Sequence, residues 1–443
     1  MFYIDSRDSK FVVLNKQTGR WAFFENNEKL YRDFLLLNEE RIDVNSFLLR
    51  YESENDNVSV LFEKSKRNIR DDQKIGLIIY DMTDGCNFSC SYCFAKAKSC
   101  ANVIGWNVIQ KTLIQIKNSG LLKDKFRIEF TGGEVLLFFD KFKEIILNLN
   151  KLKNEMNLEF EVVIQTNASL VTKEIASFLK YHNILVGVSL DGSRKYNMKR
   201  MYRNNTETFD DIVSGIEKLK QEQLGVSVIS VISESTQYMD SFSTIKELGI
   251  NQSRMNIIRN MGNAIDNNLP INEIDYDELG REYIEFAKRV IFEEKDYFLE
   301  ANLDVLLLSL VQEFPFMCHK RRCGAGKNQI YIDINGDYYL CQEWKSVGAE
   351  KVGNCFDDGF ELGRALKKNS IYNELNTCKR NNECETCEWN NYCNICPAIR
   401  YAEHGNVDGK VNMCNFYKRV YSELLWLMNN EETKLYLLAE NKR

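Results

Sequence analysis

The chain has 443 residues, 44% of them hydrophobic and 28% charged, a composition typical of a soluble globular protein with two or three domains. Its formal net charge of −6 gives no reason to expect nucleic acid or an anionic membrane as a partner. The first residues lack the basic and then apolar pattern of a signal peptide, and no apolar run approaches the roughly 20 residues of a membrane helix, so we expect a cytoplasmic protein.

Residues 1–72 predict a small N-terminal module. Two apolar runs, 11–14 and 20–24, are separated by a turn-rich segment and indicate two strands. Residues 28–49 carry apolar side chains at helical spacing, and the charged tract 63–73 indicates a linker. Two strands followed by helices resemble the winged-helix modules that bind leader peptides in peptide-maturation systems. A decoration that only caps the next domain fits the same pattern equally well.

Strands and helices alternate through residues 73–270. The predicted strands are residues 76–81, 126–131, 159–165, 184–190, 226–231 and 254–258. The predicted helices lie near residues 106–118, 140–153, 172–181, 207–222 and 240–248. This repetition implies a parallel sheet in an α/β fold, and six units give a partial (β/α)6 barrel of the TIM type. Ligand sites on such folds lie at the C-terminal ends of the strands.

The rest of the chain is divided by its cysteine content. Residues 271–317 are helical in pattern and form a bridge, and residues 318–443 form a cysteine-rich domain that closes with a helix over 415–440. In a reducing compartment the fourteen cysteines are expected to remain thiols rather than to form disulfides. Because they are clustered, they are candidate metal ligands.

A three-cysteine loop follows the first predicted barrel strand. Cys86, Cys90 and Cys93 have the spacing C-x3-C-x2-C. Three thiolates can hold three irons of a cubane cluster and leave the fourth iron open to a ligand that carries an amine and a carboxylate. A zinc knuckle or a disulfide knot is the alternative, but structural zinc needs a fourth ligand, and only Cys100 is near. The spacing resembles the signature of the radical S-adenosylmethionine (SAM) enzymes, which implies a [4Fe–4S] cluster with SAM on the open iron.

A glycine pair and a carboxylate end the second barrel strand. Glycines allow a close approach to the backbone, and a carboxylate can accept from a ligand ammonium group. The sequence here is Thr131-Gly132-Gly133-Glu134, and it resembles the Gly-Gly-Glu motif that binds the SAM amino group in the radical SAM family. Val135 stands where that family usually has proline.

Further SAM contacts are implied by the same resemblance. The implied contacts are small polar residues at the third and fourth strand ends, a tyrosine of the cysteine loop and one arginine, namely Gln165, Asn167, Ser189, Asp191, Tyr92 and Arg200. The family often has a His-Asp-x-x-Arg pattern, whose His and Asp are replaced here, whereas the spacing from Arg200 to Thr208-Phe-Asp210 is kept. A guanidinium suits the SAM carboxylate. A solvated arginine in a basic run is the alternative interpretation of Arg200.

The C-terminal cysteines resemble the SPASM extension of radical SAM enzymes, which carries two auxiliary [4Fe–4S] clusters. The resemblance implies that auxiliary cluster I is bound by Cys318, Cys323, Cys341 and Cys396. It implies that auxiliary cluster II is bound by Cys384, Cys387, Cys393 and Cys414. The last C-x2-C gap is one residue shorter than usual, and Cys100, Cys355 and Cys378 remain unassigned. A zinc ribbon is the alternative, because two C-x2-C pairs also suit tetrahedral zinc.

The resemblance covers residues 75–414 and implies a radical SAM/SPASM enzyme with three [4Fe–4S] clusters and SAM. In that family a donor such as flavodoxin or ferredoxin supplies one electron, SAM is cleaved, and the 5′-deoxyadenosyl radical abstracts a hydrogen from the substrate. Because such enzymes mostly act on peptides, our first hypothesis is a maturase of a ribosomally made precursor peptide. It would install a thioether, as sactipeptide and ranthipeptide synthases do, or another side-chain crosslink, with the leader bound by the N-terminal module.

Two other functions remain open. One is an anaerobic sulfatase-maturing enzyme, which oxidises Cys or Ser to formylglycine. That subfamily has an Asp directly after the cysteine equivalent to Cys341, whereas this chain has Gln342. The other is a non-catalytic iron–sulfur carrier or zinc scaffold, which SAM cleavage would distinguish.

Overall fold

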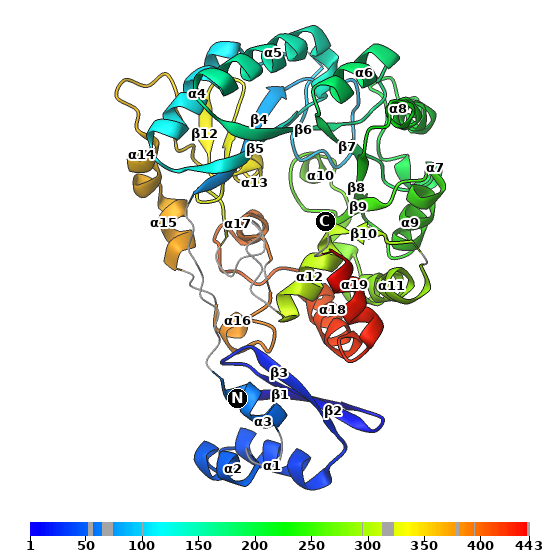
Figure 1. Cartoon of the computed structure of the whole chain (residues 1–443), viewed down its shortest axis with the longest axis vertical. Coiled ribbons are helices and arrows are strands. Elements are labelled where there is room, and N and C mark those ends of the chain that lie inside the picture. The colour runs from blue at the N-terminus through cyan, green and yellow to red at the C-terminus, as the bar shows by residue number, and fades with distance from the viewer. Residues whose placement is uncertain are drawn as a thin grey trace.

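The computed structural model describes residues 1–51, 56–63, 74–99, 101–294, 296–311, 323–377, 381–393 and 395–440. It is an α/β protein in which a large curved sheet has helices along its outer side, and a small N-terminal domain lies at one end (Figure 1). Cys318, Cys100 and Cys378 lie outside the described residues.

Among its described residues, the N-terminal domain has three antiparallel strands, in the order β1-β2-β3, and three helices. Its elements are β1 (Phe2–Arg7), β2 (Lys10–Asn15), β3 (Arg20–Glu25), α1 (Glu28–Asn38), α2 (Val44–Tyr51) and α3 (Asp56–Phe62). The sequence predicted two strands here, and the structure has three. β1 was missed because only Phe2 in it is buried and polar side chains alternate with apolar ones. Phe34 and Phe47 centre a hydrophobic core that belongs to this domain alone.

The large sheet contains all six predicted strands, paired in parallel in chain order. They are β4 (Ile75–Thr83), β5 (Leu122–Gly132), β6 (Glu159–Thr166), β7 (Leu185–Ser189), β8 (Val226–Ile232) and β9 (Gln252–Ile257). Four further strands extend the sheet, namely β10 (Leu299–Glu300) beside β9, β11 (Gln329–Ile332) parallel to β4, then β12 (Asp337–Tyr339) and β13 (Gly353–Asn354), which are antiparallel. The cysteine-rich region thus begins as part of the large sheet.

Alternation along β4 explains how the sheet is covered. Ile78 and Tyr80 join the main core on the helix-covered side, whereas Leu77 and Ile79 pack with Tyr331 on the other side. Because successive strand residues point to opposite faces, Asp81 lies on the same side as Leu77 and Ile79. A carboxylate is therefore placed on the inner face of the sheet, at the end where β4 leads into the cysteine loop.

Helices join and cover the strands (Figure 1). Those of the region with the six parallel strands are α4 (Trp106–Asn118), η1 (Val135–Phe138), α5 (Phe139–Glu155), α6 (Lys173–Tyr181), α7 (Arg194–Asn197), α8 (Phe209–Gln221), α9 (Gln237–Glu247) and α10 (Asn263–Asp266). The bridge comprises η2 (Ile271–Glu273), α11 (Tyr276–Lys288), η3 (Arg289–Glu293) and α12 (Ala301–Val311).

The C-terminal region is mostly short helices. They are α13 (Gln342–Ser346), α14 (Leu362–Lys368), α15 (Ser370–Thr377), α16 (Asn382–Thr386), α17 (Pro397–His404), α18 (Cys414–Leu427) and α19 (Glu431–Glu440). α18 packs against α11 and, through Trp426 and Glu423, against β1 of the N-terminal domain, where their side chains contact Asp5 and Arg7 at 2.7 Å. In the part of the chain that the structure describes, no helix is long and apolar enough to span a membrane.

Candidate active site and cluster sites

The three-cysteine loop is fixed by backbone hydrogen bonds on both sides. The Cys86 amide donates to the Lys98 carbonyl at 3.1 Å, and the Ser89 amide donates to the Met201 carbonyl at 2.8 Å. All three cysteines are half-buried free thiols. Burial raises the pKa of Cys86 and of Cys90 to about 12, and the Glu134 carboxylate adds to the shift at Cys86. Iron ligation would have to offset this cost, because the thiolate is the binding form.

The glycine pair at the end of β5 packs against this loop. A Cβ on Gly133 would lie 1.8 Å from the Gly85 carbonyl oxygen, and Gly132 has a φ of +107°. The amides of Gly133 and Glu134 donate to the carbonyls of Thr83 and Gly85 at 2.8 and 2.9 Å. The glycines are therefore required for a close backbone contact within the protein, in addition to any contact with a ligand.

The Glu134 carboxylate joins the ends of β5 and β6. It is 1% exposed and accepts from the Thr166 hydroxyl at 2.6 Å, the Asn167 amide at 2.7 Å and the Leu136 amide at 3.0 Å. Burial raises the pKa of Glu134, and these three donors act in the opposite direction. Carboxylate oxygens accept more than one hydrogen bond each. A ligand ammonium would join this set rather than replace it.

The polar residues predicted at the next strand ends are not all at one place. Asn167 Nδ2 donates to Asn87 Oδ1 at 2.9 Å and lies 3.9 Å from Cys86 Sγ, so Asn167 borders the cysteine loop. Gln165 is instead beside Gly187, where a Cβ would lie 2.1 Å from Gln165 Oε1. Ser189 is half-buried at the end of β7.

A buried cluster of three interacting side chains, Arg200, Asp191 and Tyr92, is joined to the cysteine loop through Tyr92. Both Arg200 Nε and Nη2 lie 3.0 Å from Asp191 oxygens, the Tyr92 hydroxyl donates to the same carboxylate, and the guanidinium lies 5.4 Å from the Tyr92 ring centroid. Burial would lower the pKa of Arg200, but the Asp191 charge raises it overall. Arg200 is therefore not the solvated arginine of the alternative interpretation. Its guanidinium is paired with Asp191, and its contact with the SAM carboxylate stays a prediction.

Three of the four cysteines predicted for auxiliary cluster I are brought together. Burial raises the pKa of Cys341 well above its ordinary value, and the thiols of Cys323 and Cys396 add to the shift. Cys341 is the residue before α13, where β12 leads into this helix. The fourth predicted ligand, Cys318, falls outside the described ranges.

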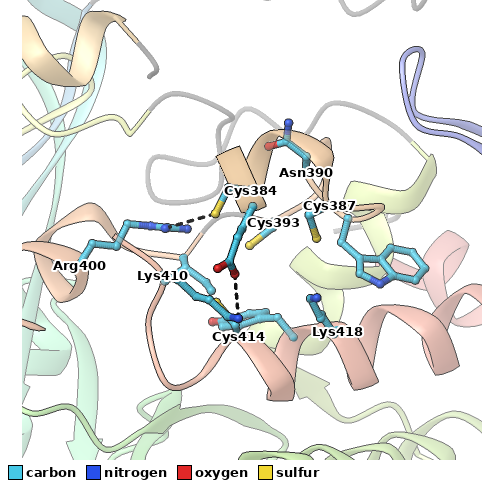
Figure 2. Close-up of a pocket in the computed structure, with 12 residues that line it drawn as sticks. Cys384, Cys387, Asn390, Cys393, Arg400, Lys410, Cys414 and Lys418 are labelled. Atoms are coloured by element: carbon cyan, nitrogen blue, oxygen red, sulfur yellow. Dashed lines mark hydrogen bonds and ion pairs between the residues drawn. The ribbon is translucent and has the colours of Figure 1, made fainter. Parts of the chain in front are cut away.

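All four cysteines predicted for auxiliary cluster II line one pocket (Figure 2). Cys384, Cys387, Cys393 and Cys414 come from α16, the segment after it and the first residue of α18. The pocket is partly open to solvent, and the space between its atoms, solvent included, is about 480 Å3. The pKa values of Cys387 and Cys414 are raised overall, mainly by burial. Nearby positive charges oppose this rise, from Lys418 at Cys387 and from Arg400 and Lys410 at Cys414.

The cysteine geometry is relevant to the zinc alternative. Among the described residues, no three His, Cys, Asp or Glu side chains lie close enough together to hold one metal ion. A cubane binds each thiolate through a different iron and so needs its cysteines farther apart than the ligands of a single zinc ion. The assignment of these cysteines to iron–sulfur clusters stays a prediction.

Sequence reasoning missed a second polar site on the inner face of the sheet. Lys345 Nζ lies 2.5 Å from Asp81 Oδ2 and 3.4 Å from the Tyr331 hydroxyl. Gln342, one turn earlier on α13, contacts the Thr131 hydroxyl at 3.4 Å. Asp81 and Lys345 are 264 residues apart, so no local pattern could have paired them.

Comparisons with known proteins agree with this architecture. The sequence model of the Radical SAM superfamily matches residues 80–258. The cysteine-type anaerobic sulfatase-maturating enzyme of Clostridium perfringens (strain 13 / Type A) is 27% identical over 167 residues, which are 37% of this chain and 45% of that enzyme. The first curated relatives are matched over only 45–56% of their length, about half.

Two solved structures share the fold over most of the chain. Native anSMEcpe with bound AdoMet has a TM-score of 0.67 at 19% identity, covering 81% of this chain and 99% of that one. Streptococcus suis SuiB bound to its precursor peptide SuiA has a TM-score of 0.59 at 15% identity, covering 94% of this chain and 100% of that one. Residues 80–258 therefore match the Radical SAM superfamily model, and the chain shares its fold with these two proteins over most of its length.

Proposed function

We propose that the chain is a radical SAM maturase that crosslinks a ribosomally made precursor peptide. The observation that carries the proposal is the N-terminal domain, which has its own core and lies against α18, next to the proposed cluster II pocket. A domain in this place could hold a leader peptide while the core peptide enters the barrel. The fold likeness to SuiB extends over 94% of the chain, more than the 81% for anSMEcpe.

Specific roles follow for residues of this chain. When bound, SAM and the loop cluster would supply a carbon radical on the substrate. Cys86, Cys90 and Cys93 would hold the cluster, and Glu134 would accept from the SAM ammonium. The peptide would reach the reacting centre from the inner face of the sheet, where Gln342 and the Asp81–Lys345 pair line the approach.

Sulfatase-type maturation is the second candidate, because the Clostridium perfringens relative carries that name. A base must remove a proton when the substrate radical becomes an aldehyde or thioaldehyde. The amide of Gln342 has no useful basicity. Crosslinking does not need a base at that position if the substrate cysteine is already bound as a thiolate.

Anaerobic incubation with SAM, a reductant and a candidate precursor, followed by tandem mass spectrometry, tests the proposal. Loss of two hydrogens from a cysteine-containing peptide, with fragments that join two residues, is the expected result. Formylglycine in a sulfatase-motif peptide, formed at a comparable rate, would establish the second candidate instead. Gln342→Ala should keep substantial crosslinking if no base acts there.

Metal content tests the cofactor assignment separately. Three cubanes correspond to about twelve irons per chain after anaerobic reconstitution. Replacing Cys86, Cys90 and Cys93 with Ala should remove about four irons and all cleavage of SAM. Full SAM cleavage by that triple variant would be incompatible with the assigned catalytic cluster and would favour another centre.

A further inference from the structure

A buried arginine faces the pocket that contains the four cysteines proposed for auxiliary cluster II. Arg400 lies on α17 and is 4% exposed. Its Nη1 is 3.6 Å from Cys384 Sγ and donates to the Gly409 carbonyl at 2.5 Å, with the Asp408 carbonyl at 3.5 Å. Figure 2 shows the guanidinium pointing toward Cys384 across the pocket.

No carboxylate forms a salt bridge with this guanidinium within the described ranges. Of the other cations that line the pocket, Lys410 is paired with Glu383 at 2.8 Å, and Lys410 and Lys418 are both exposed. Burying a charge without a partner of opposite charge is costly. The Glu403 carboxylate interacts with Arg400 electrostatically but forms no salt bridge with it. The other negative partners available to Arg400 are the thiolates of Cys384 and Cys414 on the cysteine side of the pocket.

We propose that Arg400 is the counter-charge of auxiliary cluster II and raises the reduction potential of that cluster. The proposal rests on the proposed assignment of a cluster to Cys384, Cys387, Cys393 and Cys414. A cubane bound by four thiolates is an anion, and reduction adds one electron and one more negative charge. Net charge and hydrogen bonds to sulfur set such potentials, and a fixed cation at a ligand sulfur favours the reduced form.

This role matches what crosslinking would require. When a peptide carbon radical and a cysteine thiol form a C–S bond, one electron and one proton are released. The proton goes to solvent or a base, and the electron goes to a cluster that is able to accept it. A cluster whose potential is raised by Arg400 is a better acceptor than the same cluster without a cation.

The test compares two ways of removing one positive charge from the same pocket. Arg400→Gln removes the buried charge, Lys418→Gln removes an exposed one, and Arg400→Lys keeps a charge but loses the planar fork. Full-length protein is reconstituted anaerobically and titrated with reductant, and the reduced clusters are followed by electron paramagnetic resonance. The cluster II signal is identified as the one that disappears in Cys387→Ser.

Arg400→Gln is expected to lower the ratio of reduced to oxidised cluster II at least about tenfold at fixed potential, equivalent to about 59 mV for a one-electron couple. Lys418→Gln should change it by no more than about twofold, because solvent screens the exposed charge. Arg400→Lys should stay close to the unmodified protein. A potential unchanged in Arg400→Gln, or lowered equally in Lys418→Gln, would overturn the proposal.

Iron content separates the possible failures. Unmodified protein with about eight irons and no signal that depends on Cys387 would refute the cluster assignment itself. If Arg400→Gln loses cluster II and Arg400→Lys keeps it, the reduction potential of cluster II in Arg400→Lys tests the proposal. A potential far below that of the unmodified protein would contradict the role of the charge. Loss of cluster II from both variants would show that Arg400 only fixes the loop at Gly409, and would also overturn the proposal.

Discussion

Replacing Asp191 with Asn tests whether the buried cluster of Arg200, Asp191 and Tyr92 fixes the cysteine loop. Asp191 is 1% exposed and accepts four hydrogen bonds or ion-pair contacts, from the Val231 amide at 2.8 Å, from the Tyr92 hydroxyl and from two nitrogens of Arg200 at 3.0 Å. Asparagine keeps the shape but loses the charge, and its amide group would face one pair of these donors.

The expected loss follows from the burial of both partners. The side chains of Arg200 and Asp191 are 9% and 1% exposed, and breaking a buried pair in this way costs about 3–5 kcal/mol, because it leaves an unpaired buried charge. The urea slope rises with chain length, so about 4 kcal/mol/M is taken here rather than the roughly 1–3 kcal/mol/M of small proteins, and the unfolding midpoint should fall by about 0.7–1.3 M. Because Tyr92 belongs to the cysteine loop, reconstituted iron should also fall by up to about four per chain.

Two comparisons make the result decisive. Glu207→Gln breaks an ion pair with Arg194 at 2.8 Å whose side chains are about half exposed, and it should leave the midpoint almost unchanged. The double variant Asp191→Asn/Arg200→Gln should lose less than the sum of its single variants, because no unpaired charge remains. If Asp191→Asn were as mild as Glu207→Gln, the assignment of a buried, loop-fixing pair would be refuted.

Three further predictions follow from other parts of the molecule. Gly133→Ala should destabilise the chain by about 3 kcal/mol or more in urea unfolding, because its Cβ would lie 1.8 Å from the Gly85 carbonyl oxygen; a smaller loss would contradict the tight packing. Burial would raise the pKa of Asp33, but hydrogen bonds from two α2 side chains lower it overall, so this carboxylate stabilises the N-terminal domain above its ordinary pKa, and the contribution disappears as pH falls through the lowered value. Asp33→Asn should therefore flatten the dependence of unfolding on pH between about 5 and 2, followed by circular dichroism. Burial raises the pKa of Asp81, and the Lys345 charge opposes this rise. Lys345→Met should therefore raise that pKa further, so the variant should lose stability relative to the unmodified protein as pH rises above about 4. An equal loss at pH 5 and pH 8 would contradict this.

The sequence predicted those parts of the fold that short-range patterns encode. Six parallel strands, the loop carrying Cys86 and the glycine pair at Gly133 follow from apolar runs and local spacing. The structure has the six strands side by side in one sheet and packs the glycine pair against the loop. The sequence also indicates a short strand and turn over residues 330–336, where the structure has β11. β12 and β13 were not predicted, because two or three residues carry too little periodicity. The pairs of Arg200 with Asp191 and of Lys345 with Asp81 depend on contacts between distant segments, which no window of sequence contains.

Deletion of the N-terminal domain should affect more than leader binding. The turn between β2 and β3 contacts the segment just before Cys393, because Asn391 Nδ2 donates to the Lys16 carbonyl at 2.7 Å and the Tyr392 hydroxyl donates to the Gly19 carbonyl at 2.5 Å. Cys393 is a proposed cluster II ligand, so removing residues 1–63 should cost up to about four irons while SAM cleavage without peptide stays near normal. The variant without residues 1–63 is expected to bind the precursor more weakly. Asn391→Ala, which keeps the domain but removes its contact with Lys16, should retain the affinity if the domain itself captures the leader. If the affinity is unchanged after the deletion, the domain has a structural role and does not bind the leader.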